Sequence, residues 1–251
     1  MSAILPLRWS NLKHVGRSMA HFKYYLDNPI PETDNMRVGS RVHDLVLAGG
    51  RNRFAVWEGG RRAGKEWDAF NAAHPCETIL TGDQEIRAGL IASAVRANPE
   101  ASAALFGCVT EQRREWTIAG RSCCGIPDAV GPSSIVDLKV TRDGSPGKFP
   151  WHARRMGWLG QLAWYDYGLF EGKAINLSIV SVEDLAPHLV TVYRLTPDAA
   201  EMGHRIWRSH FERLRVCEDS DVWPGYSDCV VPLEVDQEFS LHLGTEEVTV
   251  E

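Results

Sequence analysis

Two carboxylates and a lysine lie close together near the middle of the sequence, in a pattern suited to metal-dependent hydrolysis. Asp128 is followed by Asp137 and Lys139. Neighbouring carboxylates repel each other and favour a hard divalent cation, and Mg²⁺ binds one or two carboxylates together with water and phosphate oxygens. A lysine beside metal-bound water can orient it or accept its proton. These residue types indicate phosphodiester hydrolysis, with a surface ion pair on a hairpin as the alternative.

A predicted strand positions the second carboxylate and the lysine. Residues 135–140 are β-branched or apolar apart from Asp137 and Lys139, whose side chains share one face of a strand. The apolar residues between and beside them form the opposite face, which can pack on a core. The turn signal at 131–134 predicts that the Asp128 segment returns as a neighbouring strand. We therefore expect the three polar side chains to converge.

Other polar residues could join this cluster. His43 follows Gly39 by four residues on a predicted helix, and a helical glycine often marks the close approach of another group. His43 could bind metal or phosphate, although a lone helical histidine is more often structural. Glu111 and Glu115 lie on a predicted strand, where either could be a further ligand or an ordinary surface residue.

A second set of polar residues lies on the helix predicted over 151–169. Arg154, Trp158, Gln161 and Tyr165 follow the three- and four-residue spacing of one helical face. An entirely apolar or aromatic stripe would indicate core. Arginine and glutamine on the same stripe indicate a face that meets a polar ligand, such as a DNA backbone.

The predicted elements around these residues define an α/β fold. Helices are predicted over 10–26, 36–48, 66–73, 81–97, 99–106, 151–169 and 196–216, and strands over 54–57, 109–119, 122–130, 134–141, 174–183 and 188–195. This order indicates a central mixed β-sheet flanked by α-helices, with an N-terminal helical elaboration. We expect a single domain over 1–251, divided into a mainly helical part (1–107), the core (108–216) and an acidic C-terminal segment (217–251).

The charges are distributed unevenly along the chain. The net charge is −6, yet residues 1–65 carry eleven Lys and Arg against five Asp and Glu. No Lys or Arg follows Arg215, whereas ten Asp and Glu do. A basic N-terminal third beside an acidic C-terminal segment could guide DNA, because clustered cations release counterions from the nucleic acid. Ordinary solvated helix faces are the alternative.

Composition also narrows the class of protein. No apolar run approaches the length of a membrane span, and the N-terminus lacks the pattern of a signal peptide, so we expect a soluble, cytoplasmic protein without membrane contact. The six cysteines include no C-x-x-C pair. They therefore indicate neither a zinc site nor a disulfide framework.

The order and spacing of the polar residues resemble a known nuclease signature. Pro127 and Asp128, followed by the Asp-Leu-Lys run at 137–139, resemble the PD-(D/E)xK motif of the restriction-endonuclease-like core. Two residue pairs resemble the flanking motifs of its RecB-like branch: Gly39 with His43, and Gln161 with Tyr165. Four segments resemble the nuclease domain of phage and prophage exonuclease VIII (RecE): 10–25, 39–47, 64–67 and 223–226.

This resemblance implies a role for each matching residue. It assigns one or two Mg²⁺ ions, or Mn²⁺, to four ligands: His43, Asp128, Asp137 and the Leu138 carbonyl. Lys139 would position or deprotonate the attacking water. Gln161 and Tyr165 would hold the DNA end or set the surroundings of the lysine, and Glu111 would be a further acid.

The resemblance also implies an activity and partners. Members of the family are processive exonucleases that remove 5′ nucleotides from linear double-stranded DNA, leaving 3′ single strands for an annealing protein of the RecT type. It implies a phage or prophage origin and a ring-shaped homo-oligomer. We expect no iron–sulfur cluster, because no cysteine precedes Cys76 and only Cys217 and Cys229 follow residue 200. The alternatives are an endonuclease of the same fold and a catalytically idle DNA-binding subunit.

Overall fold

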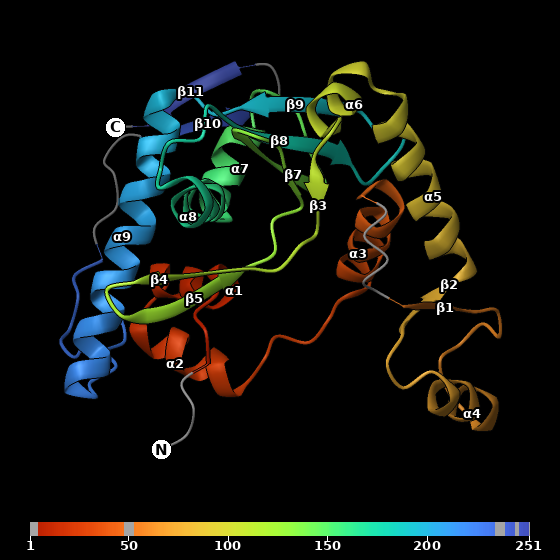
Figure 1. Cartoon of the computed structure of the whole chain (residues 1–251), viewed down its shortest axis with the longest axis horizontal. Coiled ribbons are helices and arrows are strands. Elements are labelled where there is room, and N and C mark those ends of the chain that lie inside the picture. Colours follow the sequence, from red (N-terminus) through yellow and green to blue (C-terminus); the bar gives the residue numbers. More distant parts are fainter. Residues whose placement is uncertain (1–4, 48–52, 234–238, 244–245, 251) are drawn as a thin grey trace.

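A mixed β-sheet lies at the centre of the molecule (Figure 1). The computed structural model describes residues 5–47, 53–233, 239–243 and 246–250, and within them the sheet has five strands in the order β3-β6-β7-β8-β9. Strand β7 (Ser134–Thr141) runs parallel to β8 (Asn176–Glu183) and antiparallel to β6 (Ala129–Val130). The edge strands β3 (Val109–Thr110) and β9 (Val190–Arg194) are antiparallel to their neighbours. The predicted mixed α/β fold is thereby confirmed.

Helices cover both faces of this sheet. Helices α3 (Asp34–Leu47) and α5 (Gly82–Ala97) pack against β7 and β8 on one face. Helices α8 (Trp158–Phe170) and α9 (Pro197–Ser220) lie together on the other face (Figure 1). The two hydrophobic cores are therefore separated by the sheet.

Strand β7 shows the predicted alternation of side chains. Val136 and Leu138 are buried in the core beneath α3 and α5, whereas Ile135 is buried in the core beneath α8 and α9. Asp137 and Lys139 lie on the same side of the strand as Ile135, because side chains on alternate residues share a face. The two polar groups therefore project toward α8.

The other elements surround this central unit. They are α1 (Trp9–Leu12), the 3-10 helix η1 (Lys13–Gly16), α2 (Met19–Asp27), β1 (Phe54–Trp57), α4 (Lys65–Ala73), β2 (Thr78–Thr81), α6 (Pro99–Leu105), β4 (Arg114–Ile118), β5 (Arg121–Gly125), α7 (Phe149–Arg155), β10 (Phe239–Leu243) and β11 (Glu246–Val250). Strands β1 and β2 form a parallel pair, whereas β4 with β5 and β10 with β11 form antiparallel pairs. None of the helices in the described ranges is long and apolar enough to cross a membrane.

The single helix predicted over 10–26 is wrong. The segment forms α1, η1 and α2, and the last of these begins after Ser18. The Ser18 hydroxyl accepts a hydrogen bond from the His21 amide at 3.1 Å, which satisfies a helix-start donor and favours a new N-terminus at this point. The buried stripe nevertheless continues from Leu12 through Phe22.

The helix predicted over 151–169 also divides in two. Gly157 adopts a left-handed backbone conformation with φ of 76°, which separates α7 from α8. Arg154 therefore lies on α7, whereas Trp158, Gln161 and Tyr165 lie on α8. The prediction that Arg154 shares a helical face with the other three residues was wrong, because the chain changes direction before Trp158.

The strands predicted over 109–119 and 122–130 are each divided. Only β3 and β6 belong to the central sheet, and β4 with β5 forms a separate hairpin. Glu111 has a left-handed φ of 48° between β3 and β4, and Pro127, which has no amide hydrogen, lies between β5 and β6. Strand β2 and the β10–β11 hairpin were not predicted.

Candidate active site

The structure brings the predicted histidine, carboxylates and lysine together. Lys139 Nζ lies 2.6 Å from Asp137 Oδ2, and His43 Nδ1 lies 3.5 Å from Asp128 Oδ1. Asp128 Oδ2 accepts a hydrogen bond of 2.7 Å from the Leu138 amide. This bond fixes the first carboxylate beside β7, so that residues from α3, the β5–β6 connection and β7 meet at one place.

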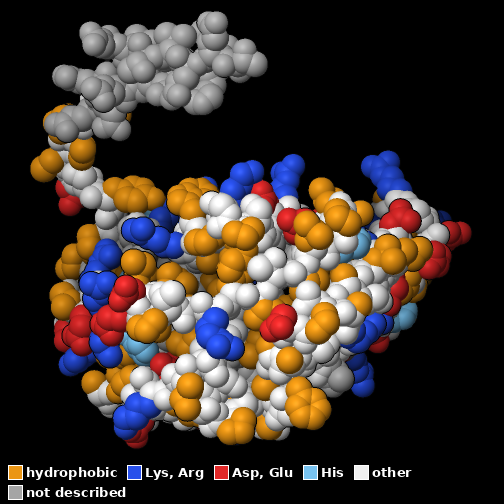
Figure 2. Space-filling model, turned by 90° about the horizontal axis from the view of Figure 1, so that it is seen from above, with side chains coloured by type: hydrophobic (Ala, Val, Ile, Leu, Met, Phe, Trp, Pro, Cys, Tyr) orange, Lys and Arg blue, Asp and Glu red, His pale blue; other side chains and the backbone are white. Residues whose placement is uncertain are grey.

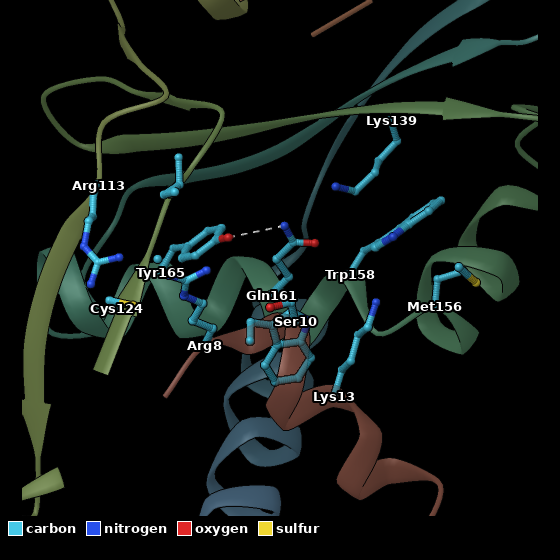
Figure 3. A pocket seen from close by; sticks show the side chains of 13 residues that line it. Arg8, Ser10, Lys13, Arg113, Cys124, Lys139, Met156, Trp158, Gln161 and Tyr165 are labelled. Carbon is cyan, nitrogen blue, oxygen red and sulfur yellow. Dashed lines mark hydrogen bonds between the residues drawn. The ribbon is translucent and has the colours of Figure 1, made fainter. Parts of the chain in front are cut away.

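Helix α8 completes the cluster from the opposite side. Gln161 Nε2 donates a hydrogen bond of 3.1 Å to Asp137 Oδ1 and a longer one of 3.5 Å to the Tyr165 hydroxyl, drawn in Figure 3. The Lys139 ammonium lies 5.7 Å from the centre of the Trp158 ring, within the range of a cation–π contact. The predicted face of α8 thus orients both members of the Asp137–Lys139 pair.

A pocket of about 330 Å³ opens beside this cluster. Lys139, Gln161 and Tyr165 line one side of it, and Figure 3 shows Lys13 extending toward the same space beside Met156 and Trp158. Its other basic residues are Arg8 and Arg113. The cation-rich pocket therefore reaches Lys139, whereas Asp137 is buried behind it.

The two carboxylates have different acidities. Burial raises the pKa of Asp128, but the His43 imidazole and the Lys139 ammonium lower it more, to about 2. Burial also raises the pKa of Asp137, and the Asp128 charge adds to this, so that the pKa of Asp137 is about 6 despite the ammonium of Lys139. The difference arises because one buried site holds two carboxylates.

The two cations are stabilised by the same carboxylates. Burial lowers the pKa of His43, but the Asp128 carboxylate outweighs it and places the pKa above the usual value. Burial likewise lowers the pKa of Lys139. The charge of Asp137, and to a smaller extent that of Asp128, outweighs burial and raises this pKa above the ordinary value. Lys139 is therefore an ammonium group in this structure.

Comparison with known families agrees with this arrangement. Residues 9–231 match the family described as a PDDEXK-like domain of unknown function (DUF3799). The chain belongs to this family. The resemblance of its motifs to the PD-(D/E)xK superfamily is thereby confirmed, and an exonuclease VIII type is consistent with it.

A solved structure shares the fold of this PDDEXK-like domain at low sequence identity. A chain from Eubacterium rectale, provisionally described as an exonuclease, aligns with a TM-score of 0.63 and 14% identity over 92% of this chain and 91% of that chain. A phage-related exonuclease from Haemophilus somnus aligns with a TM-score of 0.37 and 13% identity over 84% and 96% of the two chains, a likeness too weak to support an argument. No curated protein matches the chain in sequence.

The donor groups of the PDDEXK-like site fit a hard divalent cation in their chemistry. Burial raises the pKa of Asp137 and the neighbouring Asp128 carboxylate raises it further, and a cation between the two carboxylates would relieve their repulsion. Within the described residues, however, no three His, Cys, Asp or Glu side chains are already placed around a common metal position. Lys139 and His43 neutralise the carboxylates instead. Metal binding therefore requires a neutral His43 and a shift of the Lys139 ammonium away from Asp137.

The two candidate glutamates differ in position. Glu111 was predicted to lie on a strand, but it lies in the bend after β3. There its amide donates a hydrogen bond to the Asp128 carbonyl at 3.0 Å. It lines a groove together with His43 and Lys139. Glu115 lies on β4, pairs with Arg113 at 2.7 Å and lines neither this groove nor the pocket. Only Glu111 is placed beside the cluster.

Gly39 is not explained by packing within the chain. A Cβ atom at this position would meet nothing within 4 Å, and Gly39 lines the groove that contains His43. Close approach of another group to this glycine therefore stays a prediction, and the approaching group would have to be a ligand.

Sequence analysis did not single out the basic residues of the pocket. Arg8 and Lys13 precede or begin short helical turns, and Arg113 lies before β4. For Arg8 and Lys13 the only signal was the excess of Lys and Arg in the first 65 residues, and Arg113 had none.

Proposed function

We propose that the protein is a metal-dependent deoxyribonuclease, and more specifically an exonuclease that digests linear double-stranded DNA. The observation that supports this most strongly is the convergence of His43, Asp128, Asp137 and Lys139 beside a cation-lined pocket. Two carboxylates and a lysine at a site accessible to phosphate are the groups that phosphodiester hydrolysis requires.

Each residue would have a distinct role. Asp128, Asp137, His43 and the Leu138 carbonyl would hold Mg²⁺ or Mn²⁺, which when bound polarises phosphate oxygens and activates water. Gln161 keeps Asp137 in place through its hydrogen bond to Oδ1. As an ammonium, Lys139 would orient the attacking water and stabilise negative charge that develops on the phosphate. Tyr165 would help to hold the DNA end.

The direction of digestion and the partners follow from the resemblance to exonuclease VIII. We propose digestion from 5′ ends, leaving 3′ single-stranded tails for an annealing protein of the RecT type. A homo-oligomeric ring around the DNA and a phage or prophage origin belong to the same proposal. Glu111 would act as a further acid beside the metal ligands.

End-labelled linear duplex tests this function. With Mg²⁺ or Mn²⁺ the wild-type protein should degrade the duplex, and Lys139→Ala and Asp128→Ala should each reduce the rate by about 10²- to 10⁴-fold, as expected when a positioned proton-handling or charge-stabilising group is removed. Lys173→Ala is the control, because this exposed lysine pairs only with Glu171 among the described residues. Equal rates for all four proteins would reject the assignment.

The substrate form separates the alternatives. An exonuclease spares covalently closed circles, whereas an endonuclease of this fold cuts them. A duplex labelled separately at each end gives the polarity, and release from 3′ ends would reject that part of the proposal. Binding of duplex without any metal-dependent cleavage would instead identify an idle DNA-binding subunit.

A further inference from the structure

A second basic groove lies next to the candidate active site. It has a volume of about 740 Å³ and runs between η1, α7 and α9. Its lining cations are Lys13, Arg17, Arg154 and Arg155, and the imidazoles of His14 and His210 also line it. No Asp or Glu is among the described residues that line it. We call it the η1–α7 groove.

The η1–α7 groove adjoins the pocket beside the candidate active site. Trp9, Lys13 and Met156 line both. In Figure 3, Lys13 and Met156 stand at the side of the pocket that lies beyond Trp158. A flexible polyanion that enters the pocket near Lys139 can therefore extend past Lys13 into the groove without crossing an acidic surface.

The positive charges of this groove are not neutralised by the protein. Across the described ranges, Lys13, Arg154 and Arg155 form no ion pair with a carboxylate. The Arg155 guanidinium instead lies 5.2 Å from the Trp151 ring centre, and Arg17 donates to the Tyr226 hydroxyl at 3.0 Å. On the face shown in Figure 2, Lys and Arg side chains are spread among hydrophobic and acidic ones. The groove gathers cations that pair with no carboxylate among the described residues.

The groove also presents apolar surface between its cations. Met202 and Ile206 of α9 and Met156 line it, and Met156 is 45% exposed. A duplex offers mainly its phosphate backbone to such a surface, whereas a single strand offers both phosphates and the faces of unpaired bases. The combination of cations and apolar side chains therefore favours a single strand.

We propose that the η1–α7 groove binds single-stranded DNA that extends from the candidate active site. This inference rests on the proposed nuclease function, because that function supplies a strand separated from its complement. Arg154 and Arg155 contact phosphates from α7, and Lys13 connects the groove to the pocket.

Binding without cleavage tests this proposal. A fluorescent single-stranded oligonucleotide is titrated with full-length protein in EDTA at several salt concentrations, and anisotropy is recorded. Arg154→Ala/Arg155→Ala should weaken binding by 10-fold or more at low salt. It should also reduce the slope of log K against log salt by about 1.4, since each phosphate contact on a single strand contributes about 0.7. Arg53→Ala/Lys173→Ala removes two exposed cations outside the groove and should bind like wild type.

Each contrary result has a defined meaning. If the α7 double variant keeps the wild-type melting temperature and the wild-type affinity and salt slope, the groove does not bind the strand. A larger loss for blunt duplex than for the single strand would also overturn the proposal, in favour of a duplex-binding surface. Failure of the nuclease function is distinguishable, because it appears as absent cleavage by the wild type while the salt slope still depends on Arg154 and Arg155.

Discussion

Two imidazoles on α9, the buried His204 and the half-buried His210, illustrate how much depends on the partners of one side chain. Trp207 Nε1 donates to His204 Nδ1 at 3.1 Å, so His204 Nε2 carries the hydrogen that it donates to Asp166 Oδ2 at 3.0 Å. Both nitrogens are satisfied, and α8 is tied to α9. His210, six residues later, has no hydrogen-bond partner for its buried Nδ1 within the described chain. Burial and the nearby Arg213 lower the pKa of His210 to about 4.

His210 should therefore make stability depend on pH. Its folded-state pKa lies below the unfolded value of 6.5, so the unfolded state binds the proton more readily between pH 6.5 and 4. Its contribution to stability is present above pH 6.5 and is lost as the pH falls through this window. The free energy of unfolding, measured with urea, should therefore fall between pH 7 and pH 5 by about 1 kcal/mol less in His210→Gln than in the wild type. This figure is discounted for the partial exposure of His210. If the free energy of unfolding changes with pH equally in wild type and His210→Gln, this prediction is wrong.

The packing of α8 against α9 depends on the absence of a side chain at one position. A Cβ atom added to Gly203 would lie 2.4 Å from the backbone carbonyl oxygen of Leu159. Backbone cannot move aside as a flexible side chain can, so the two helices would have to separate.

Two glycine substitutions test this contact against intrinsic helix propensity. Gly203→Ala should lower the free energy of unfolding by about 1–3 kcal/mol through overpacking. Gly89→Ala on α5 is the matched control, because a Cβ atom there meets nothing within 4 Å. It should raise stability by about 0.5–1 kcal/mol, since alanine favours helix over glycine. Chemical denaturation measures both, and a stabilised Gly203→Ala protein would show that the helices can separate without cost.

Across the whole molecule, the candidate active site joins elements that are distant in sequence. His43 comes from α3, Asp137 and Lys139 from β7, and Gln161 from α8. Two opposite-charge pairs, at 3.5 Å and 2.6 Å, hold these side chains together. A cation bound by Asp128, Asp137 and His43 would therefore connect α3 to the central sheet in the folded state only.

Divalent metal should accordingly raise the melting temperature. At 100 times the dissociation constant, a ligand that binds only the folded state stabilises it by about 2.7 kcal/mol. For a chain of this size that corresponds to a shift of roughly 5–10 °C. Asp137→Asn should abolish most of the shift, whereas Glu115→Gln should keep it, because Glu115 lies outside the cluster. A Mn²⁺ or Mg²⁺ shift of equal size in Asp137→Asn would remove Asp137 from the ligand set.

Patterns short enough to act within one element were predictable from the sequence. The alternation of residues 135–140 determined which face of β7 carries Asp137 and Lys139. The motif order around Asp128 identified the superfamily. Such local preferences depend on nearest neighbours along the chain, which the sequence lists directly.

Other features were decided only by tertiary structure. The division of residues 151–169 at Gly157 moved Arg154 onto α7, into a groove with Lys13 and Arg17 from the N-terminal segment. The placement of Glu111 beside the cluster and of Glu115 away from it likewise depends on the bend after β3. The groove depends on contacts between segments separated by more than a hundred residues, and the placement of Glu111 depends on a backbone turn whose direction local composition does not specify. The chemistry of the site could therefore be predicted from residue types and their spacing, whereas the basic groove beside it became visible only once the chain was folded.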